Sequence, residues 1–204
     1  KIPLLPASWG IDLLSFSGHK FHGPKGIGGL YVRQGIKLQP LLQGGSQENN
    51  LRPGTENIPG ITGMGAAAAE IGTTIESNLQ KFNQLKTVLI DKITATIPGT
   101  RINSPIAPDF APNILSISFK GVRAEVLLHS LEQDGIFVST RSACTSKKKH
   151  ASHVLQALKL SPTEIEGTIR ISFGHFNQLS ELDYVLERIQ FHIDNFRRIT
   201  GWRE

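Results

Sequence analysis

Apolar residues recur at steps of three and four along two long stretches of the chain, which is the spacing of one face of an α-helix. The first stretch follows Pro59 and ends before Pro98, and its apolar face comprises Leu79, Phe82, Leu85, Leu89 and Ile93. In the second, Asn177 is predicted to cap a helix whose apolar face comprises Leu182, Val185, Leu186, Ile189 and Ile193. The pattern therefore predicts two long amphipathic helices.

Shorter apolar runs predict strands over residues 11–16, 29–33, 114–119, 136–139 and 168–173. A helix is predicted over 123–133 with Gly135 as its stop, and Ser152 can cap another short helix that carries Leu155 and Leu158. From about residue 78 onward helices and strands alternate, which predicts a small α/β layer domain over 78–204.

The first 77 residues differ from the rest. They contain a long polar, glycine-rich loop over 43–60, and loops of that length are usually functional or disordered. Two short strands are too few to bury the apolar side chains of this region. We therefore expect residues 1–77 to be an incomplete portion of a larger α/β domain.

The composition is that of a globular protein, with 39% hydrophobic and 19% charged residues among 204. The net charge is +5, but the basic residues are dispersed and no basic stripe interleaved with aromatic residues occurs, so nucleic-acid binding is not expected. The sequence shows neither the apolar core of a signal peptide nor the roughly 20 apolar residues of a membrane span. A cytoplasmic protein is expected.

Cys144 is the single cysteine, so an internal disulfide is excluded and a reducing compartment is expected. A lone cysteine is more often a small buried hydrophobe than a nucleophile. Cys144, however, is followed by a basic run over 147–150, which is typical of a solvated loop and favours the reactive thiolate. A zinc site with His150 and His153 is disfavoured, because the spacing fits no standard finger and a fourth ligand is missing.

Small polar residues, a histidine and a lysine follow the first predicted strand, where open α/β sheets bind ligands. The pair at Lys25 and Gly26 is not a P-loop, because no Ser or Thr follows, and residues 26–29 are not a dinucleotide fingerprint. The spacing alone leaves a phosphate-ligand site and a plain tight turn both open.

Residues 15–26 read SFSGHKFHGPKG and resemble the cofactor-lysine segment of cysteine desulfurases, within the class V aminotransferase group of fold-type I enzymes. The resemblance implies that Lys20 binds pyridoxal 5'-phosphate (PLP) covalently and that Ser17, Gly18 and His19 complete the cofactor site, with Ser17 on the phosphate. Lys25 is the alternative lysine, but the motif places it downstream as structure.

Residues 44–57 read GGSQENNLRPGTEN and resemble a second family loop, although Ser46 and Pro53 replace the usual Gly and Ser. In the family the threonine of this loop, here Thr55, reaches the PLP phosphate of the partner subunit. The resemblance thus implies a homodimer with shared active sites. The alternative is that Thr55 caps the helix that begins near Pro59.

Two further segments extend the resemblance. Residues 138–146, read with 152–155, resemble the family's loop that bears the active cysteine, which makes Cys144 the sulfur acceptor. Residues 168–173 resemble the strand whose arginine binds the substrate carboxylate, which makes Arg170 the candidate, since the planar guanidinium matches a carboxylate bidentately. The alternative for Arg170 is an ordinary surface arginine on a strand.

The resemblance implies a PLP-dependent cysteine desulfurase that converts L-cysteine to L-alanine. Lys20 moves the Cα proton, and the persulfide on Cys144 goes to a sulfur-acceptor or scaffold protein for iron–sulfur cluster assembly or thiolation. The resemblance covers only the second half of a family member. Residues 1–77 are therefore expected to be the C-terminal portion of the PLP-binding large domain, and residues 78–204 the small C-terminal domain. The alternatives are another class V aminotransferase such as a selenocysteine lyase, or an inert fragment that acts as a dimerising or acceptor-binding module.

Overall fold

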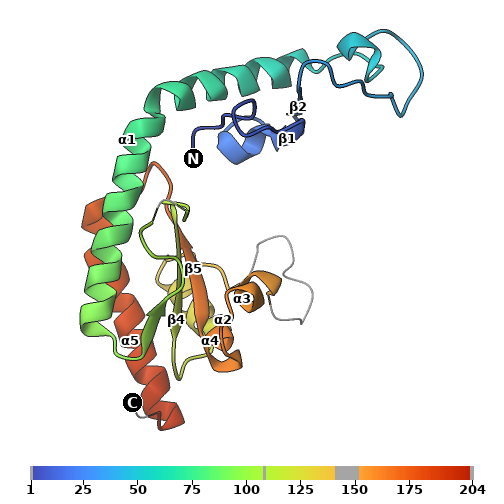
Figure 1. Cartoon of the computed structure of the whole chain (residues 1–204). Helices are drawn as coiled ribbons and strands as arrows, with labels where there is room; N and C mark the ends of the chain where they lie inside the picture. Colours follow the sequence, from blue (N-terminus) through green and yellow to red (C-terminus); the bar gives the residue numbers. More distant parts are fainter. Residues whose placement is uncertain (1, 108, 141–151, 203–204) are drawn as a thin grey trace. The chain divides into compact units, whose positions relative to one another are not determined.

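The computed structural model describes residues 2–107, 109–140 and 152–202 (Figure 1). The chain divides into two compact units, Lys1–Ser77 and Asn78–Glu204. Helix α1 (Ile58–Thr96) begins in the first unit and ends in the second. In the described ranges, none of the helices has both the length and the apolar character that crossing a bilayer requires.

The first unit contains an antiparallel hairpin of β1 (Leu13–Ser17) and β2 (Gly28–Val32), with Ser17 paired with Gly28 at its closed end. The 3₁₀ helix η1 (Gly18–Phe21) follows β1 directly. Both predicted strands are confirmed to within two residues. The turn is tied by two backbone hydrogen bonds, from Gly18 N to Ile27 O (2.9 Å) and from Gly23 N to Gly18 O (3.0 Å).

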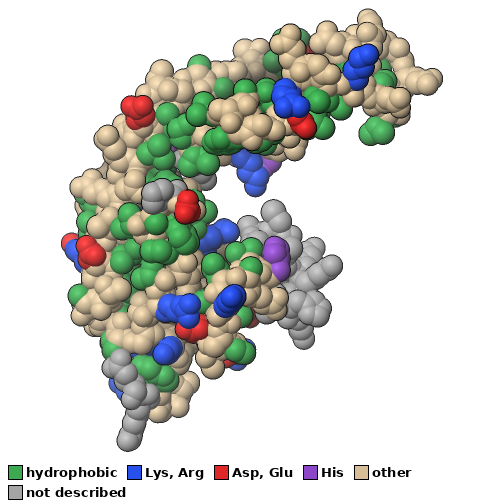
Figure 2. Space-filling model, in the orientation of Figure 1, with side chains coloured by type: hydrophobic (Ala, Val, Ile, Leu, Met, Phe, Trp, Pro, Cys, Tyr) green, Lys and Arg blue, Asp and Glu red, His purple; other side chains and the backbone are tan. Residues whose placement is uncertain are grey.

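Apolar side chains remain exposed on this hairpin and on the segment before it (Figure 2). Trp9, Leu13, Phe16 and Leu30 are each exposed by two fifths or more. A sheet of two strands has too little surface to bury such residues by itself. The first unit thus keeps a set of large apolar groups in contact with solvent.

Residues 33–57 are irregular apart from the 3₁₀ turn η2 (Glu48–Asn50), as the polar, glycine-rich composition predicts. The loop ends where Asn57 accepts a hydrogen bond at Oδ1 from Gly60 N (3.1 Å). That bond satisfies one of the free N–H groups at the start of α1. Asn57, and not Thr55, therefore caps the helix.

The second unit is built on a three-stranded antiparallel sheet in the order β3 (Thr100–Ile102), β4 (Ile114–Phe119), β5 (Thr168–Ser172). Its helices are the second part of α1, then α2 (Ala124–Gln133), α3 (His153–Ala157), α4 (Pro162–Glu166), the 3₁₀ turn η3 (Leu179–Glu181) and α5 (Leu182–Thr200). The α/β class predicted from the sequence is observed.

The sheet buries one face because apolar and polar residues alternate along its strands. Leu115 pairs with Ile171 and Ile117 with Ile169, and these four side chains enter one core with Phe119. The predicted helix faces, apart from Leu79, complete this core or pack against it. The core also holds Phe82, Leu85, Leu89, Ile93, Leu127, Leu131, Leu182, Ile189 and Ile193.

Two local predictions in the second unit are wrong. The strand predicted over 136–139 is reduced to a single bridge between Ser139 and Arg170. Asn177 does not cap the last helix, because η3 intervenes and α5 begins at Leu182; Asn177 Oδ1 instead accepts a hydrogen bond from Gly174 N (2.8 Å). The hydrogen bond of Asn177 therefore closes the turn before η3.

Candidate active site

Lys20 lies on η1 at the edge of a cavity of about 480 Å³ in the first unit. Two hydroxyl side chains, Ser15 and Ser17, line the same cavity, and its apolar wall comprises Ile2, Leu4, Phe16 and Phe21. No hydrogen bond from the Lys20 ammonium is found among the described residues of this unit. The cavity thus offers a free primary amine next to hydroxyl groups.

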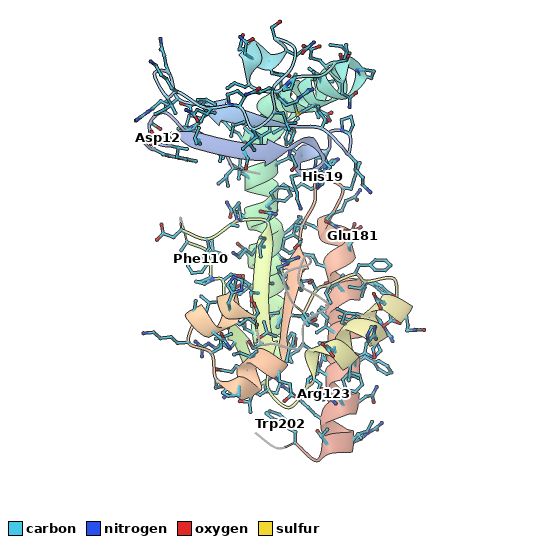
Figure 3. All side chains as sticks on the ribbon, turned by 90° about the vertical axis from the view of Figure 1, so that its right-hand side faces the viewer. Asp12, His19, Phe110, Arg123, Glu181 and Trp202 are labelled. Atoms are coloured by element: carbon cyan, nitrogen blue, oxygen red, sulfur yellow. The ribbon has the colours of Figure 1, made fainter. Side chains whose placement is uncertain are left out.

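The backbone of the turn fixes this arrangement. Gly18 is buried, and a Cβ atom added there would lie 3.0 Å from Ile27 Cγ2 and 3.3 Å from Pro24 O, so a side chain at this position would require its neighbours to move by a few tenths of an ångström. His19 follows on the exposed side of η1 and is labelled in Figure 3. The structure therefore brings Ser17, Gly18 and Lys20 to one place, with His19 next to them in the chain.

The donor set of this cavity fits PLP. The aldehyde of that cofactor needs a primary amine, its phosphate needs hydroxyl or N–H donors, and its ring needs an apolar surface. Lys20, Ser17 and the wall residues Phe16 and Phe21 supply groups of these three kinds. Lys25, the alternative lysine, does not line the cavity.

Thr55 lies in the same unit but does not line the Lys20 cavity. Its loop contains three consecutive non-glycine residues with left-handed backbone, Glu48, Asn49 and Asn50, at φ values of 49°, 55° and 66°. The loop is held by a hydrogen bond from Gly54 N to Gln47 Oε1 (3.2 Å). Left-handed backbone is unfavourable for most L-residues, although asparagine adopts it more readily than the others. Thr55, which is exposed, thus follows a loop whose backbone is unfavourable at Glu48.

Arg170 occupies the middle of β5, on the face of the sheet opposite the apolar core. Its Nε atom is buried and has no hydrogen-bond partner in the described part of the chain. The guanidinium borders a cavity of about 360 Å³ that Phe110 and Leu155 also line. Figure 3 shows Phe110 on the side of β4 where the short orange helices of residues 153–166 lie. Arg170 is therefore not an ordinary surface arginine.

Cys144 and its basic run lie in residues 141–151, outside the described residues. The neighbours of that segment are described, however. Thr140, just before it, and Ser152, just after it, both line the Arg170 cavity. His150, part of the disfavoured zinc hypothesis, also lies outside the described residues, and the described residues contain no cluster of three metal-ligating side chains.

The sequence did not single out one residue that lines this cavity and another that anchors one of its loops. Asn103 is buried and lines the cavity with Oδ1 unpartnered among the described residues. Lys86 is fully buried on α1 and donates from Nζ to Pro105 O (3.2 Å) and Ala111 O (3.3 Å), which anchors the loop that carries Phe110. The burial of Asn103 and Lys86 follows from tertiary packing, which the sequence does not show. The alternation of apolar and polar residues along β4 and β5 could, however, have indicated the polar face of the sheet on which Asn103 lies.

The chain matches one known protein family and several curated proteins. The sequence profile described as "Aminotransferase class-V" matches residues 1–185. A protein of Nostoc sp. named cysteine desulfurase is 41% identical over 203 residues, which cover 100% of this chain and 50% of that protein. The chain spans about half the length of the curated relatives it matches.

Solved structures agree with this result. One described as a NifS-like protein superposes with a TM-score of 0.78 at 35% identity, covering 91% of this chain and 47% of that chain. Another, described as SspA in complex with cysteine, superposes with a TM-score of 0.55 at 30% identity, covering 82% of this chain and 45% of that chain. The α/β fold of the chain is thus similar to that of NifS-like proteins.

Proposed function

The chain belongs to the class V aminotransferase family, and on that premise we propose that it forms the part of a PLP-dependent cysteine desulfurase that carries the cofactor lysine and the acceptor cysteine. One observation carries the proposal. Thr140 and Ser152, which flank the segment that contains Cys144, line the same cavity as the partly buried Arg170. A segment with both ends at this cavity can bring its thiol to a substrate whose carboxylate Arg170 holds.

The two units take the roles expected for the two parts of such an enzyme. Residues 1–77 form the C-terminal portion of the PLP-binding large domain, and the apolar side chains exposed on the β1–β2 hairpin support the view that this portion is incomplete. Residues 78–204 form the small domain that carries Arg170 and Cys144. The NifS-like structures, each matched over about half its length, support this assignment.

Lys20 is the residue that binds PLP covalently, with Ser17 donating to the phosphate and with Gly18 and His19 shaping the turn. Thr55, exposed on its ordered loop, serves the cofactor phosphate of a partner subunit, so the protein acts as a homodimer. When bound, PLP supplies an electron sink that stabilises negative charge at the substrate Cα. The unpartnered amine of Lys20 beside Ser17 supports this part of the proposal.

The reaction moves one sulfur atom from L-cysteine to Cys144. Arg170 binds the substrate carboxylate through paired N–H groups, and Lys20 moves the proton at Cα. The Cys144 thiolate attacks the substrate sulfur, so an S–S bond forms while the Cβ–S bond breaks and its electron pair stays with the carbon skeleton, which takes up a proton. L-cysteine plus the thiol gives L-alanine plus the persulfide, and no external oxidant is needed.

The persulfide sulfur then passes to an acceptor or scaffold protein for iron–sulfur cluster assembly or thiolation. Cysteine as substrate is supported by the names of the relatives and by the related protein described in complex with cysteine. The single cysteine supports action in a reducing compartment such as the cytoplasm.

The test uses a longer protein, in which the chain is joined to a segment corresponding to the part of its relatives that it does not match. After reaction with L-cysteine and PLP, mass spectrometry of the alkylated protein should find one additional sulfur on the Cys144 peptide. Cys144→Ser should retain the visible absorbance of the bound cofactor but release no alanine. Alanine release by Cys144→Ser at the wild-type rate would overturn the proposal.

A further inference from the structure

Lys86 is a charged residue inside the second unit. Its side chain is 1% exposed and lies on the buried face of α1, four residues after Phe82 and three before Leu89. Within the described ranges no carboxylate pairs with its ammonium, which donates to two backbone carbonyls instead. Burying a lysine without an acidic partner is unfavourable, and an apolar side chain would suit the position better. A lysine here therefore indicates a role other than stability.

The two acceptors, Pro105 O (3.2 Å) and Ala111 O (3.3 Å), lie at the two ends of loop 105–111, in the segment that joins β3 to β4. Three of the residues 104–112 are prolines, which have no N–H group, so the segment has few backbone donors of its own. The described residues of the loop form one backbone hydrogen bond with each other, from Phe110 N to Ala107 O (3.0 Å). The Lys86 ammonium thus ties the beginning of the loop to its end.

Loop 105–111 forms one wall of the Arg170 cavity of about 360 Å³. Asp109, Phe110 and Ala111 line that cavity, and Phe110 is only partly buried (Figure 3). The lining residue Leu155 is also apolar. An apolar wall with a few polar groups beside it is typical of a cavity that binds a small molecule. The hydrogen bonds of Lys86 therefore decide where this wall lies.

We propose that Lys86 is a positioning residue for the substrate: by holding loop 105–111, it places Phe110 against the aliphatic part of bound L-cysteine. Lys86 itself touches no reacting atom and acts through Phe110. The inference rests on the function proposed above, in which Arg170 binds the substrate carboxylate at this cavity. Because Phe110 contacts the substrate equally before and during the reaction, its displacement weakens binding and leaves the rate at saturation unchanged.

The experiment measures alanine release from L-cysteine by the PLP-loaded longer protein used to test the proposed function. Lys86→Met removes the N–H donors and keeps an unbranched side chain in the core. It should raise KM for L-cysteine about tenfold. Both kcat and the visible absorbance of the cofactor should stay as in wild type. Lys81→Met is the matched control and should keep both constants, because Lys81 lies on the same helix and donates to His175 O (2.6 Å), away from the cavity.

A double-mutant cycle separates positioning from a general structural effect. Phe110→Ala should raise KM by a similar factor, and adding Lys86→Met to it should raise KM no further, since Lys86 acts through the Phe110 ring. Amide hydrogen exchange of Phe110 should be faster in Lys86→Met, whereas that of Ile117 in β4 should not change.

The outcomes separate this role from the proposed function. A wild-type KM in Lys86→Met or in Phe110→Ala would overturn the role of Lys86 and leave the function intact. Additive effects in the double variant, or an equal rise of KM in Lys81→Met, would do the same. If Lys86→Met does not fold, the KM of Phe110→Ala decides alone. A wild-type protein that releases no alanine would overturn the proposed function, and the role of Lys86 with it.

Discussion

Arg101 donates from Nη1 to Glu164 Oε1 across 2.8 Å, and this pair ties α4 to β3 on the polar face of the sheet. Glu164 Oε2 also accepts hydrogen bonds from Ser161 N and Ser161 Oγ, both at 2.8 Å. The bond from Ser161 N and the bond from Glu164 N to Ser161 Oγ (3.3 Å) together form the capping box of α4. Because its backbone carbonyl accepts a hydrogen bond from Thr168 Oγ1, Glu164 also ties α4 to the first residue of β5.

The acid stability of the second unit should depend on Glu164. The Arg101 guanidinium, followed by the bonds from Ser161, lowers the pKa of Glu164 from 4.5 to about 2. A carboxyl whose pKa is lower in the folded state stabilises the fold above 4.5 and loses that contribution as the pH falls toward 2. Glu164→Gln should therefore flatten the pH dependence of the free energy of unfolding in this window. Urea unfolding at several pH values measures it, with the exposed Glu187→Gln as control.

A second carboxylate joins α2 to α5. Asp134 Oδ2 lies 2.9 Å from Arg188 Nε and 2.6 Å from His192 Nε2, and the bonds from Arg188 and then His192 lower the pKa of Asp134 below its ordinary 3.8. Asp134→Asn should lower the free energy of unfolding above pH 3.8, and the difference from wild type should shrink as the pH falls below that value.

Amide hydrogen exchange should locate this effect, with faster exchange at the C-terminal end of α2. Glu132→Gln is the matched control, because Glu132 lies on the same helix in an exposed pair with His129. Equal acceleration of exchange in both variants would contradict a specific clamp by Asp134.

Lys86 should make stability rise with pH in the alkaline range. Burial lowers the pKa of Lys86 from its ordinary 10.5, so between the two pKa values the unfolded chain binds more protons than the folded chain. Stability then increases as the pH rises toward 10.5. Lys86→Met should remove this increase, whereas Lys120→Met, which changes an exposed lysine, should keep it. An unchanged pH dependence in Lys86→Met would show that another group titrates.

The core of the second unit should respond strongly to a cavity. Leu89 is fully buried on α1, in the same core as Ile117 and Ile189. Leu89→Ala should lower the free energy of unfolding by about 2–5 kcal/mol. The exposed Val126→Ala should change it by about 0.5 kcal/mol or less. Denaturant unfolding compares the two, and a small effect at Leu89 would mean that α1 does not complete this core.

Periodicity predicted much of the fold because it records burial directly. The run 114–119 alternates in polarity and forms β4 with the predicted bounds. The predicted α1 and α5 faces, apart from Leu79, lie in the core or pack against it. β3 was not predicted, since three residues are too short to show a period. The helix α4 was not predicted either, although Ser161, Pro162 and Glu164 carry the sequence signature of a capping box.

The site was predictable only in part. The motif of residues 15–26 indicated Lys20, which does line a cavity with Ser17. Asn103 carried no local signal, because its burial and its orientation depend on Ser118 and Thr168, which are distant in sequence. The strand expected over 136–139 failed since only Ser139 comes within pairing distance of Arg170. Long-range packing decides each of these cases.

Covalent capture of the cofactor tests the central claim most directly. The completed protein, incubated with PLP, reduced with borohydride and digested, should carry the phosphopyridoxyl group on the peptide of Lys20. Lys25→Ala should give the same labelled peptide, and Lys20→Ala should give none. A label on Lys25, or full labelling of the Lys20→Ala variant at another lysine, would contradict the account.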